Sequence, residues 1–415
     1  MSLSTPLTHC RLCDTTDLNE VFTLVPTPAG DHYLPADRHP ERLPVFPLSL
    51  RQCRECGHVQ LGAIVDPEYI YRDYIYTTKS SLGLAEHFQD YAQKTIAELK
   101  LKPGALVVEI GSNDGTMLRA FQNLGMRVLG VDPAIEIAEI ATQSGIPTIP
   151  DFFRTEIADQ ILADHGPAQL VIANNVLANV SSLRSTVTAI RHLMSPDGVF
   201  VFETGYLRYL AEDCVFDNIY HEHIDYHAVR PLVRFFSSLD MQITDVHVSK
   251  SKGSSIRCFV THSHAERSVS SNVEKLCERE IQHHYQTPAP YKALATHLES
   301  VKSNLHEILG AAKARGEIIA GFGASVGVTT MLYFFELEQY ISYLIDDNSS
   351  RHGLFSPGLG RRVSSPLIFD TKDKPDLVVV LAWRYAGVIV EKYKALTKDG
   401  GRFLIPLPKL EFIKG

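Results

Sequence analysis

Residues Val107 to Thr116 read V-V-E-I-G-S-N-D-G-T, in which a run of apolar β-formers leads into a glycine-rich turn. We expect a helix to begin near Thr116, directly after that turn. A strand, a turn and a helix in this order present backbone N–H groups and a helix N-terminus to a ligand. The turn lacks the lysine that follows the glycines of a phosphate loop. It also lacks the G-x-G-x-x-G spacing of a nicotinamide site.

A second predicted strand, Arg127 to Val131, ends in Asp132, 21 residues beyond Gly111. An acidic side chain at that offset can accept hydrogen bonds from a ribose diol. The pair E-I-G-x-N-x-G and V-D-P resembles motif I and its acidic partner in class I S-adenosylmethionine-dependent methyltransferases. We therefore predict an S-adenosylmethionine site formed by Glu109, Gly111, Asn113, Gly115, Asp132, Asp151, Phe152 and Asn174.

Helices and strands alternate around this turn, which predicts an α/β fold with a parallel, doubly wound sheet. Residues 80–101 have helical periodicity, and further helices are expected at 117–124, 135–144 and 185–193. Strands are expected near residue 148, at 170–174 and at 199–203, the last after a turn at 195–198. Ligands bind at the carboxyl ends of strands in such sheets, where Glu109, Asp132, Asp151, Asn174 and Glu203 stand.

The C-terminal third predicts a second Rossmann-like unit. A long polar helical stretch at 272–315, broken by T-P-A-P at 287–290, precedes predicted strands at 318–321, 343–345, 377–382 and 402–405. The first of these strands leads into G-F-G-A-S-V-G, at Gly321 to Gly327. These glycines either approach a phosphate or only pack a helix on a strand, and the sequence leaves both possibilities open.

Four of the seven cysteines form two knuckles, Cys10-x-x-Cys13 and Cys53-x-x-Cys56, separated by 39 residues. Four thiolates satisfy a tetrahedral structural Zn²⁺ and leave no open position for a reactive water. The proline-rich segment between the knuckles has room for a hairpin. The module has too little apolar sequence for a large core, so we expect the metal to supply much of its stability.

Composition limits the class of protein. The chain has 415 residues, 45% hydrophobic and 21% charged, with a formal net charge of −8. No basic block suggests nucleic acid, and no signal peptide or membrane-spanning run is visible, so we expect a cytoplasmic protein. We expect three domains, a zinc-binding domain at 1–72, a methyltransferase domain at 73–245 and the Rossmann-like unit at 246–415. We expect a monomer or weak dimer.

The densest ionisable cluster is D-N-I-Y-H-E-H-I-D-Y-H, from Asp217 to His227. It follows the predicted strand that ends at Glu203. Histidine titrates near neutrality, and a nearby carboxylate can orient its ring, so this segment predicts general acid–base chemistry. A metal site using His221, His223 and His227 is a second possibility, because His223 and His227 have i, i+4 spacing.

The layout of almost the whole chain resembles the sugar C-methyltransferases of deoxysugar pathways, of the tetronitrose C-3'-methyltransferase type. The shared features are the two cysteine knuckles, Tyr76, E-I-G-S-N-D-G, D-F-F at 151–153, A-N-N at 173–175, F-D-N-I-Y-H-E-H, G-F-G-A, S-P-G and A-W at 382–383. The resemblance implies a zinc-binding domain, a class I methyltransferase core and a C-terminal Rossmann-like domain. It also implies a nucleotide-linked 4-keto-6-deoxy sugar as the substrate, methylated next to the ketone.

Carried over onto this chain, the acid–base residues of that family fall on Tyr220, Glu222 and His223. A C–H next to a ketone is acidic enough for a side-chain base, and we expect His223 to take the proton. Tyr220 would stabilise the enolate oxygen, and Glu222 would hold its neighbours or contact the sugar. The predicted sugar-nucleotide contacts are Tyr76, Asn179, Tyr206, Lys252, Arg257, Gly323, Ser325 and Trp383.

Three positions depart from the family pattern. Asn179 stands where some relatives have a histidine, Lys252 replaces the histidine of a histidine–glycine pair, and Arg384 replaces the asparagine of A-W-N. All three fall where the sugar nucleotide should lie, which leaves the sugar's identity open. The alternatives are a methyltransferase of a non-sugar acceptor at carbon or oxygen, a nicotinamide-dependent oxidoreductase using the C-terminal turn, and a non-catalytic binding protein.

Overall fold

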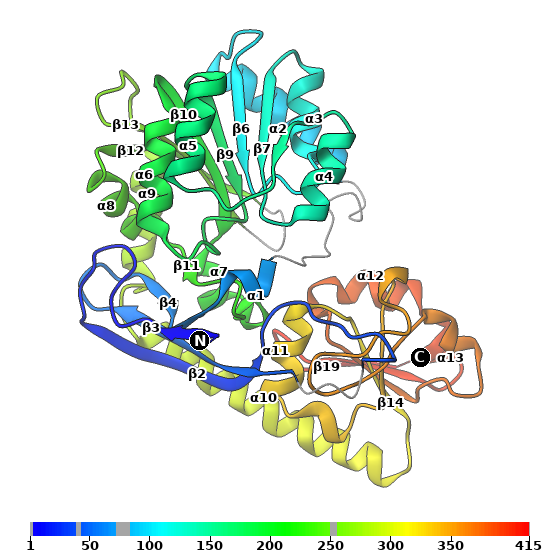
Figure 1. Cartoon of the computed structure of the whole chain (residues 1–415). Coiled ribbons are helices and arrows are strands. Elements are labelled where there is room, and N and C mark those ends of the chain that lie inside the picture. Colours follow the sequence, from blue (N-terminus) through cyan, green and yellow to red (C-terminus); the bar gives the residue numbers. More distant parts are fainter. Residues whose placement is uncertain (1–2, 39–42, 72–83, 250–254, 415) are drawn as a thin grey trace.

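The computed structural model describes residues 3–38, 43–71, 84–249 and 255–414 (Figure 1). Tyr76 and Lys252, both predicted to contact substrate, lie outside these ranges. The described strands form sheets of two, four, six and seven strands. Among the described residues, no helix is both long and apolar enough to cross a bilayer.

The seven-stranded sheet has the order β12-β13-β10-β9-β6-β7-β8 (Figure 1). Its parallel strands are β6 (Leu106–Ile110), β7 (Arg127–Val131), β8 (Thr148–Ile149), β9 (Ala168–Asn174) and β10 (Met194–Gly205). The helices between and around them are α2 (Leu84–Leu99), α3 (Thr116–Asn123), α4 (Ile135–Gln143), α5 (Thr155–His165) and α6 (Leu183–Leu193). The predicted doubly wound arrangement is confirmed, because apolar runs fill the strands and turn residues bound them.

Two details of this sheet differ from the sequence prediction. The S-P-D-G segment lies inside β10, where the register with β9 shifts between Met194 and Val199, so it makes an irregularity and not a separate turn. The predicted domain boundary at residue 245 falls inside β12 (Met241–Ser249). This strand pairs antiparallel with β13 (Ser255–His262), which pairs antiparallel with β10. The seven-stranded sheet therefore extends to His262.

The N-terminal part forms a four-stranded antiparallel sheet in the order β11-β4-β3-β2. Its strands are β2 (Leu18–Pro28), β3 (Val45–Cys53), β4 (Val59–Leu61) and β11 (Asp225–Tyr226). The predicted hairpin between the knuckles is the β2–β3 pair. A second, two-stranded sheet pairs β1 (Ser4–Pro6) with β5 (Ala63–Val65), and α1 (Pro67–Tyr71) follows. Strand β11 lies within Asp217 to His227, which we call the histidine-rich segment. This strand forms one edge of the N-terminal sheet, and we call that sheet together with the two cysteine knuckles the zinc module.

The zinc module buries apolar side chains against another part of the protein, in addition to those it buries within itself. Phe22, Leu24, Leu48 and Leu50 are buried in one core cluster that continues into the C-terminal unit. The Phe22 ring packs edge-on against Phe334, with ring centroids 5.8 Å apart. Burial of these side chains against a neighbouring helix therefore adds to the stability that we expect from the metal.

The C-terminal unit is the predicted second Rossmann-like sheet, in the order β16-β15-β14-β17-β18-β19. Its strands are β14 (Ile319–Phe322), β15 (Tyr343–Ile345), β16 (Val363–Ser364), β17 (Leu377–Val380), β18 (Arg402–Ile405) and the antiparallel β19 (Glu411–Ile413). The polar helical stretch is α9 (Ser271–Gln282) and α10 (Ala289–Ala314). The other helices of this unit are α11 (Val326–Phe334), α12 (Ala386–Lys392) and α13 (Ala395–Lys398), whereas α7 (Leu207–Glu212) and α8 (Val229–Ser237) lie between β10 and β12 in the sequence. Helix α10 runs from the N-terminal sheet toward this unit (Figure 1).

Candidate functional site

A cavity of about 510 Å³ lies at the carboxyl ends of the parallel strands, where the sequence placed the cofactor. It is lined by six of the eight predicted cofactor residues, namely Glu109, Gly111, Asn113, Asp132, Phe152 and Asn174. Asn179, predicted to contact substrate, and Glu203 at the end of β10 line it too. These side chains converge because the ends of neighbouring parallel strands share one edge of the sheet.

The glycine turn is braced by Asp132. Its carboxylate accepts the backbone N–H of Asn113 at 2.8 Å and that of Ala134 at 2.9 Å. Gly111 has φ of +69°, and a Cβ added there would lie 2.4 Å from Cγ2 of Val176. Glycine is thus required both for the backbone conformation and for the close approach of the loop after β9.

The cavity wall is rich in carboxylates. Burial raises the pKa of Glu109 well above its usual range, and the charges of Asp132 and Asp114 raise it further. Burial also raises the pKa of Asp132, against the lowering effect of its two backbone N–H donors. A cationic ligand here would relieve the repulsion among these groups. The wall therefore fits S-adenosylmethionine, which carries a sulfonium and an ammonium group.

Two predicted cofactor residues do not line the cavity. Gly115 precedes α3 with φ of +73°, and a Cβ there would lie 2.9 Å from Cγ2 of Ile146, so this glycine serves helix packing. Asp151 accepts the backbone N–H of Phe152 at 2.7 Å and forms an ion pair with Arg154 at 2.6 Å. It therefore positions two residues that line the cavity and does not line it itself.

Tyr220 and His223 form a hydrogen-bonded pair within the histidine-rich segment. The Tyr220 hydroxyl lies 2.9 Å from Nε2 of His223, and Nδ1 of His223 lies 3.0 Å from the carbonyl oxygen of Asn218. A carbonyl oxygen can only accept, so Nδ1 carries a proton. In the neutral ring Nε2 is then the acceptor, and the Tyr220 hydroxyl donates to it.

This segment is attached to the cavity through the loop after β9. The backbone N–H groups of Ile224 and Asp225 donate to the carbonyl oxygen of Ala178 at 2.7 and 3.1 Å. Residues Asn179 to Ser182 of the same loop line the cavity. Tyr220, Glu222 and His223 do not line it. The three predicted catalytic residues thus belong to a segment that is hydrogen-bonded to a cavity-lining loop.

Tyr71, which the sequence analysis missed, bridges the two layers. It lines the cavity, and its hydroxyl lies 3.5 Å from the carbonyl oxygen of Glu222. Burial raises the pKa of Tyr71 well above its usual range, as do the charges of Glu222 and Tyr220. The hydroxyl therefore stays protonated and can donate a hydrogen bond. Tyr71 could not be predicted from the sequence, because it is the last residue of the short helix α1 and belongs to none of the motifs described above.

The other histidines of the segment point elsewhere. His221 is buried, with Nε2 3.2 Å from the carbonyl oxygen of Phe46, and burial lowers its pKa to about 4. His227 stacks on His58 with ring centroids 5.8 Å apart, and burial lowers its pKa to about 4. Among the described residues, no cluster with metal-ligand spacing includes either ring or His223. The structure therefore does not support the alternative of a metal site, because the His221 and His227 rings contact different parts of the protein and do not converge with His223.

Two residues predicted to contact substrate, Tyr206 and Arg257, bind other protein side chains and are not among the residues that line the cavity. The Tyr206 hydroxyl donates to Glu280 at 3.0 Å in the protein interior. Arg257 forms an ion pair with Glu203 at 2.9 Å, and its guanidinium lies 3.7 Å from the centroid of the Tyr91 ring. Arg257 therefore reaches the cavity only through Glu203. No described contact places either side chain at the cavity, so their substrate contacts stay predictions.

The C-terminal glycine turn packs against the histidine-rich segment. A Cβ at Gly327 would lie 2.7 Å from the carbonyl oxygen of Asp217, and the Thr330 hydroxyl donates to Ile219 at 2.9 Å. Gly323 has φ of +123°, and a Cβ there would lie 3.0 Å from the amide nitrogen of Ala382. Of the two possibilities left open by the sequence, close packing accounts for Gly327.

The remaining C-terminal candidates lie near the same segment. Trp383 is buried, and Ser325 precedes α11, where its carbonyl oxygen accepts from Tyr33 at 3.5 Å. Arg384, one of the departures from the family pattern, forms an ion pair with Asp217 at 3.2 Å. This side chain holds the start of the histidine-rich segment, which the sequence analysis did not foresee.

The four knuckle cysteines come together as predicted, with all four sulfur atoms within 4.8 Å of one another. Cys10 Sγ lies 3.6 Å from Cys56 Sγ, and Cys13 Sγ lies 3.5 Å from Cys53 Sγ, which fits tetrahedral Zn–S bonds of about 2.3 Å. A hydrogen bond with Cys56 and burial raise the pKa of Cys10, and burial raises the pKa of Cys53 to about 11. Their thiolates need a cation at the centre, as zinc provides.

Comparison with known proteins agrees with this architecture. NovU, a C-methyltransferase of Streptomyces niveus, is 30% identical over 405 residues, which are 97% of this chain and 96% of NovU. Residues 10–71 match a zinc binding domain, residues 84–245 a methyltransferase domain, and residues 250–408 a C-methyltransferase C-terminal domain.

Alignments with solved structures are partial. An S-adenosylmethionine-dependent methyltransferase from Clostridium acetobutylicum aligns with 43% of this chain and 92% of its own, at 11% identity and a TM-score of 0.36. Magnesium protoporphyrin IX methyltransferase from Synechocystis, with bound S-adenosylmethionine, aligns with 44% of this chain and 86% of its own, at 14% identity and a TM-score of 0.32. These scores are too low to support an argument. On its full-length similarity to NovU and its three matched domains, the chain belongs to the C-methyltransferase family and is an S-adenosylmethionine-dependent enzyme with a structural zinc site.

Proposed function

We propose that this C-methyltransferase methylates the carbon next to the ketone of a nucleotide-linked 4-keto-6-deoxy sugar. The observation that carries the proposal is the Tyr220–His223 pair, in which Nδ1 of His223 lies 3.0 Å from a carbonyl oxygen and Nε2 lies 2.9 Å from the Tyr220 hydroxyl. A neutral imidazole near pH 7 suits removal of a proton that a ketone has made acidic.

The chemistry balances with these two side chains. The C–H bond breaks and its electron pair forms an enolate with the ketone oxygen. The proton goes to the Tyr220 oxygen while the Tyr220 hydroxyl passes its own proton to Nε2 of His223. When bound, S-adenosylmethionine would supply a sulfonium methyl group to the enolate carbon, with loss of its carbon–sulfur bond. His223 then releases its proton to solvent. Tyr71, a protonated hydroxyl in the cavity wall, is placed to donate to the enolate oxygen.

The position of the pair supports this assignment over a purely structural role. The segment that holds Tyr220 and His223 is bonded to the loop that lines the cofactor cavity, through Ile224 and Ala178. The sugar would then lie between the carboxylate-rich cavity wall and this segment. The nucleotide would extend toward the C-terminal unit, whose turn and Arg384 pack against Asp217.

The test uses purified protein, labelled methyl donor and a panel of keto sugar nucleotides, with non-sugar ketones and hydroxyl acceptors for comparison. We expect label transfer to the keto sugar nucleotides alone. In deuterated water, His223→Asn should keep S-adenosylmethionine binding but lose both methyl transfer and deuterium exchange at the substrate carbon. Loss of transfer with exchange intact would assign the base to Tyr220 or Glu222, and transfer to a hydroxyl would exclude the proposal.

A further inference from the structure

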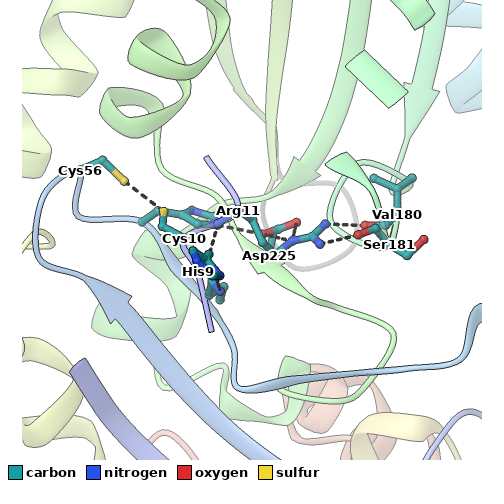
Figure 2. A network of polar contacts seen from close by, with 9 residues as sticks. His9, Cys10, Arg11, Cys56, Val180, Ser181 and Asp225 are labelled. Carbon is teal, nitrogen blue, oxygen red and sulfur yellow. Dashed lines mark hydrogen bonds and ion pairs between the residues drawn. The ribbon is translucent and has the colours of Figure 1, made fainter. Parts of the chain in front are cut away.

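The first zinc knuckle reaches the histidine-rich segment through Arg11, one of the two residues between Cys10 and Cys13 (Figure 2). Its side chain is only 6% exposed, and the side chain of Asp225 that it contacts is fully buried. Nε of Arg11 lies 2.9 Å from both carboxylate oxygens of Asp225. Asp225 belongs to β11, two residues after His223.

The other two guanidinium nitrogens of Arg11 donate to the loop after β9, whose residues Asn179 to Ser182 line the cavity. Nη1 donates to the carbonyl oxygen of Ser181 at 2.6 Å, and Nη2 donates to that of Val180 at 2.5 Å (Figure 2). Both residues line the cofactor cavity. One planar side chain therefore joins the segment that holds Tyr220 and His223 to the loop that borders the cavity. Guanidinium suits this task because its donors point in fixed directions.

The second knuckle supports the same carboxylate. His58, two residues after Cys56, is fully buried, and its Nε2 lies 2.8 Å from Oδ1 of Asp225. Asp225 is thus held by one residue from each knuckle. The zinc module does more than close the N-terminal end of the fold, because its two metal-binding loops fix a single carboxylate of the histidine-rich segment.

We propose that Arg11 is a positioning residue, which sets the Tyr220–His223 pair against the cofactor cavity through Asp225, Val180 and Ser181. The kinetic part of this inference rests on the proposed function, whereas its structural part does not. Without the three-way bridge, the base and the methyl donor would lose their relative alignment. A displacement of about 1 Å in such a pair can lower the rate roughly a hundredfold.

The chain contains a matched control in the second knuckle. Arg54 follows Cys53 as Arg11 follows Cys10, but its side chain is 62% exposed and pairs with the exposed Asp17 at 3.5 Å. Arg11→Met and Arg54→Met therefore make the same change at equivalent positions of the two metal-binding loops. Arg11→Lys keeps the charge but has one donor nitrogen in place of the three that contact Asp225, Ser181 and Val180, and it serves if the methionine variant folds poorly.

The experiment compares these variants with wild type in three measurements. We expect each variant to retain about one zinc per chain. Hydrogen–deuterium exchange of the amides of Ile224 and Asp225, which bond to Ala178, should rise at least about tenfold in the Arg11 variants only. With a keto sugar nucleotide, kcat should fall roughly a hundredfold for Arg11→Met with KM for the methyl donor within a few fold, and Arg54→Met should match wild type.

Each contrary outcome is decisive. Unchanged amide exchange in the Arg11 variants would overturn the inference, and so would zinc loss as their main defect. If wild type transfers no methyl group to the panel, the proposed function fails, and amide exchange still decides whether Arg11 fixes the segment. Active wild type with equal kcat in Arg11→Met and Arg54→Met would refute the positioning role alone.

Discussion

Replacing His221 by glutamine should remove part of the stability loss that the protein suffers in mild acid. The ring is buried, and burial lowers its pKa from 6.5 to about 4. Because the folded pKa is depressed, the unfolded chain binds a proton first as the pH falls. The stability from this residue is therefore fully present above pH 6.5 and is lost progressively between about pH 6.5 and about pH 4.

The size of the effect follows from the same two values. One pKa unit corresponds to about 1.4 kcal/mol, so the full loss is about 3 kcal/mol. Between pH 7.5 and pH 5.0 the loss from this one ring is about 2 kcal/mol. Glutamine does not titrate, and its amide can still donate to the carbonyl oxygen of Phe46, which His221 contacts at 3.2 Å.

The assay is denaturant unfolding at pH 7.5 and pH 5.0, with zinc content checked in every sample. Wild type should lose about 2 kcal/mol more than His221→Gln between the two values. His192→Gln, a change at a half-exposed ring, should lose as much as wild type. Equal pH dependence in wild type and His221→Gln would refute the assignment of His221 as a buried neutral ring with a structural role.

Three further predictions concern the cofactor and metal sites. Asp132→Ala removes the acceptor of two backbone N–H groups and the predicted ribose contact, so calorimetry should show about 1.5–3 kcal/mol weaker S-adenosylmethionine binding; unchanged affinity would remove Asp132 from the site. Gly111→Ala should weaken the same binding at least about tenfold, because the new Cβ would lie 2.4 Å from Val176, and adding Val176→Ala should restore part of it; full affinity in the single variant would contradict the clash. Cys53→Ser should lose the single zinc and lower the thermal midpoint, whereas an equally stable metal-free wild type would argue against structural zinc.

The strands of the two Rossmann-like sheets could be predicted because their signal is local. Strands Arg127–Val131, Tyr343–Ile345 and Arg402–Ile405 have the predicted bounds, since apolar runs end at turn residues in each case. The assignment of β12 and β13 to the methyltransferase sheet could not be predicted in this way. Their membership depends on which distant strand they pair with, and pairing leaves no periodicity of its own.

In the candidate site too, residues with a local signal could be predicted and residues that depend on distant contacts could not. Asp132 and Asn174 were found because they end parallel strands, which must share an edge of the sheet. Arg11 was missed because its partner Asp225 is 214 residues away, and an arginine inside a cysteine knuckle looks like any exposed one. The bond from the Tyr206 hydroxyl to the buried Glu280 could not be predicted either, because the two residues are 74 positions apart in the sequence.

The most direct test of the central claim is to locate the transferred methyl group on the product. The enzyme is incubated with a keto sugar nucleotide and S-adenosylmethionine carrying a ¹³C-labelled methyl group, and the product is examined by two-dimensional NMR. The account predicts a new carbon–carbon bond, with the labelled methyl coupled to the carbon next to the ketone and the proton of that carbon lost. A labelled methyl group attached to oxygen or nitrogen, or to a carbon not adjacent to the ketone, would contradict it.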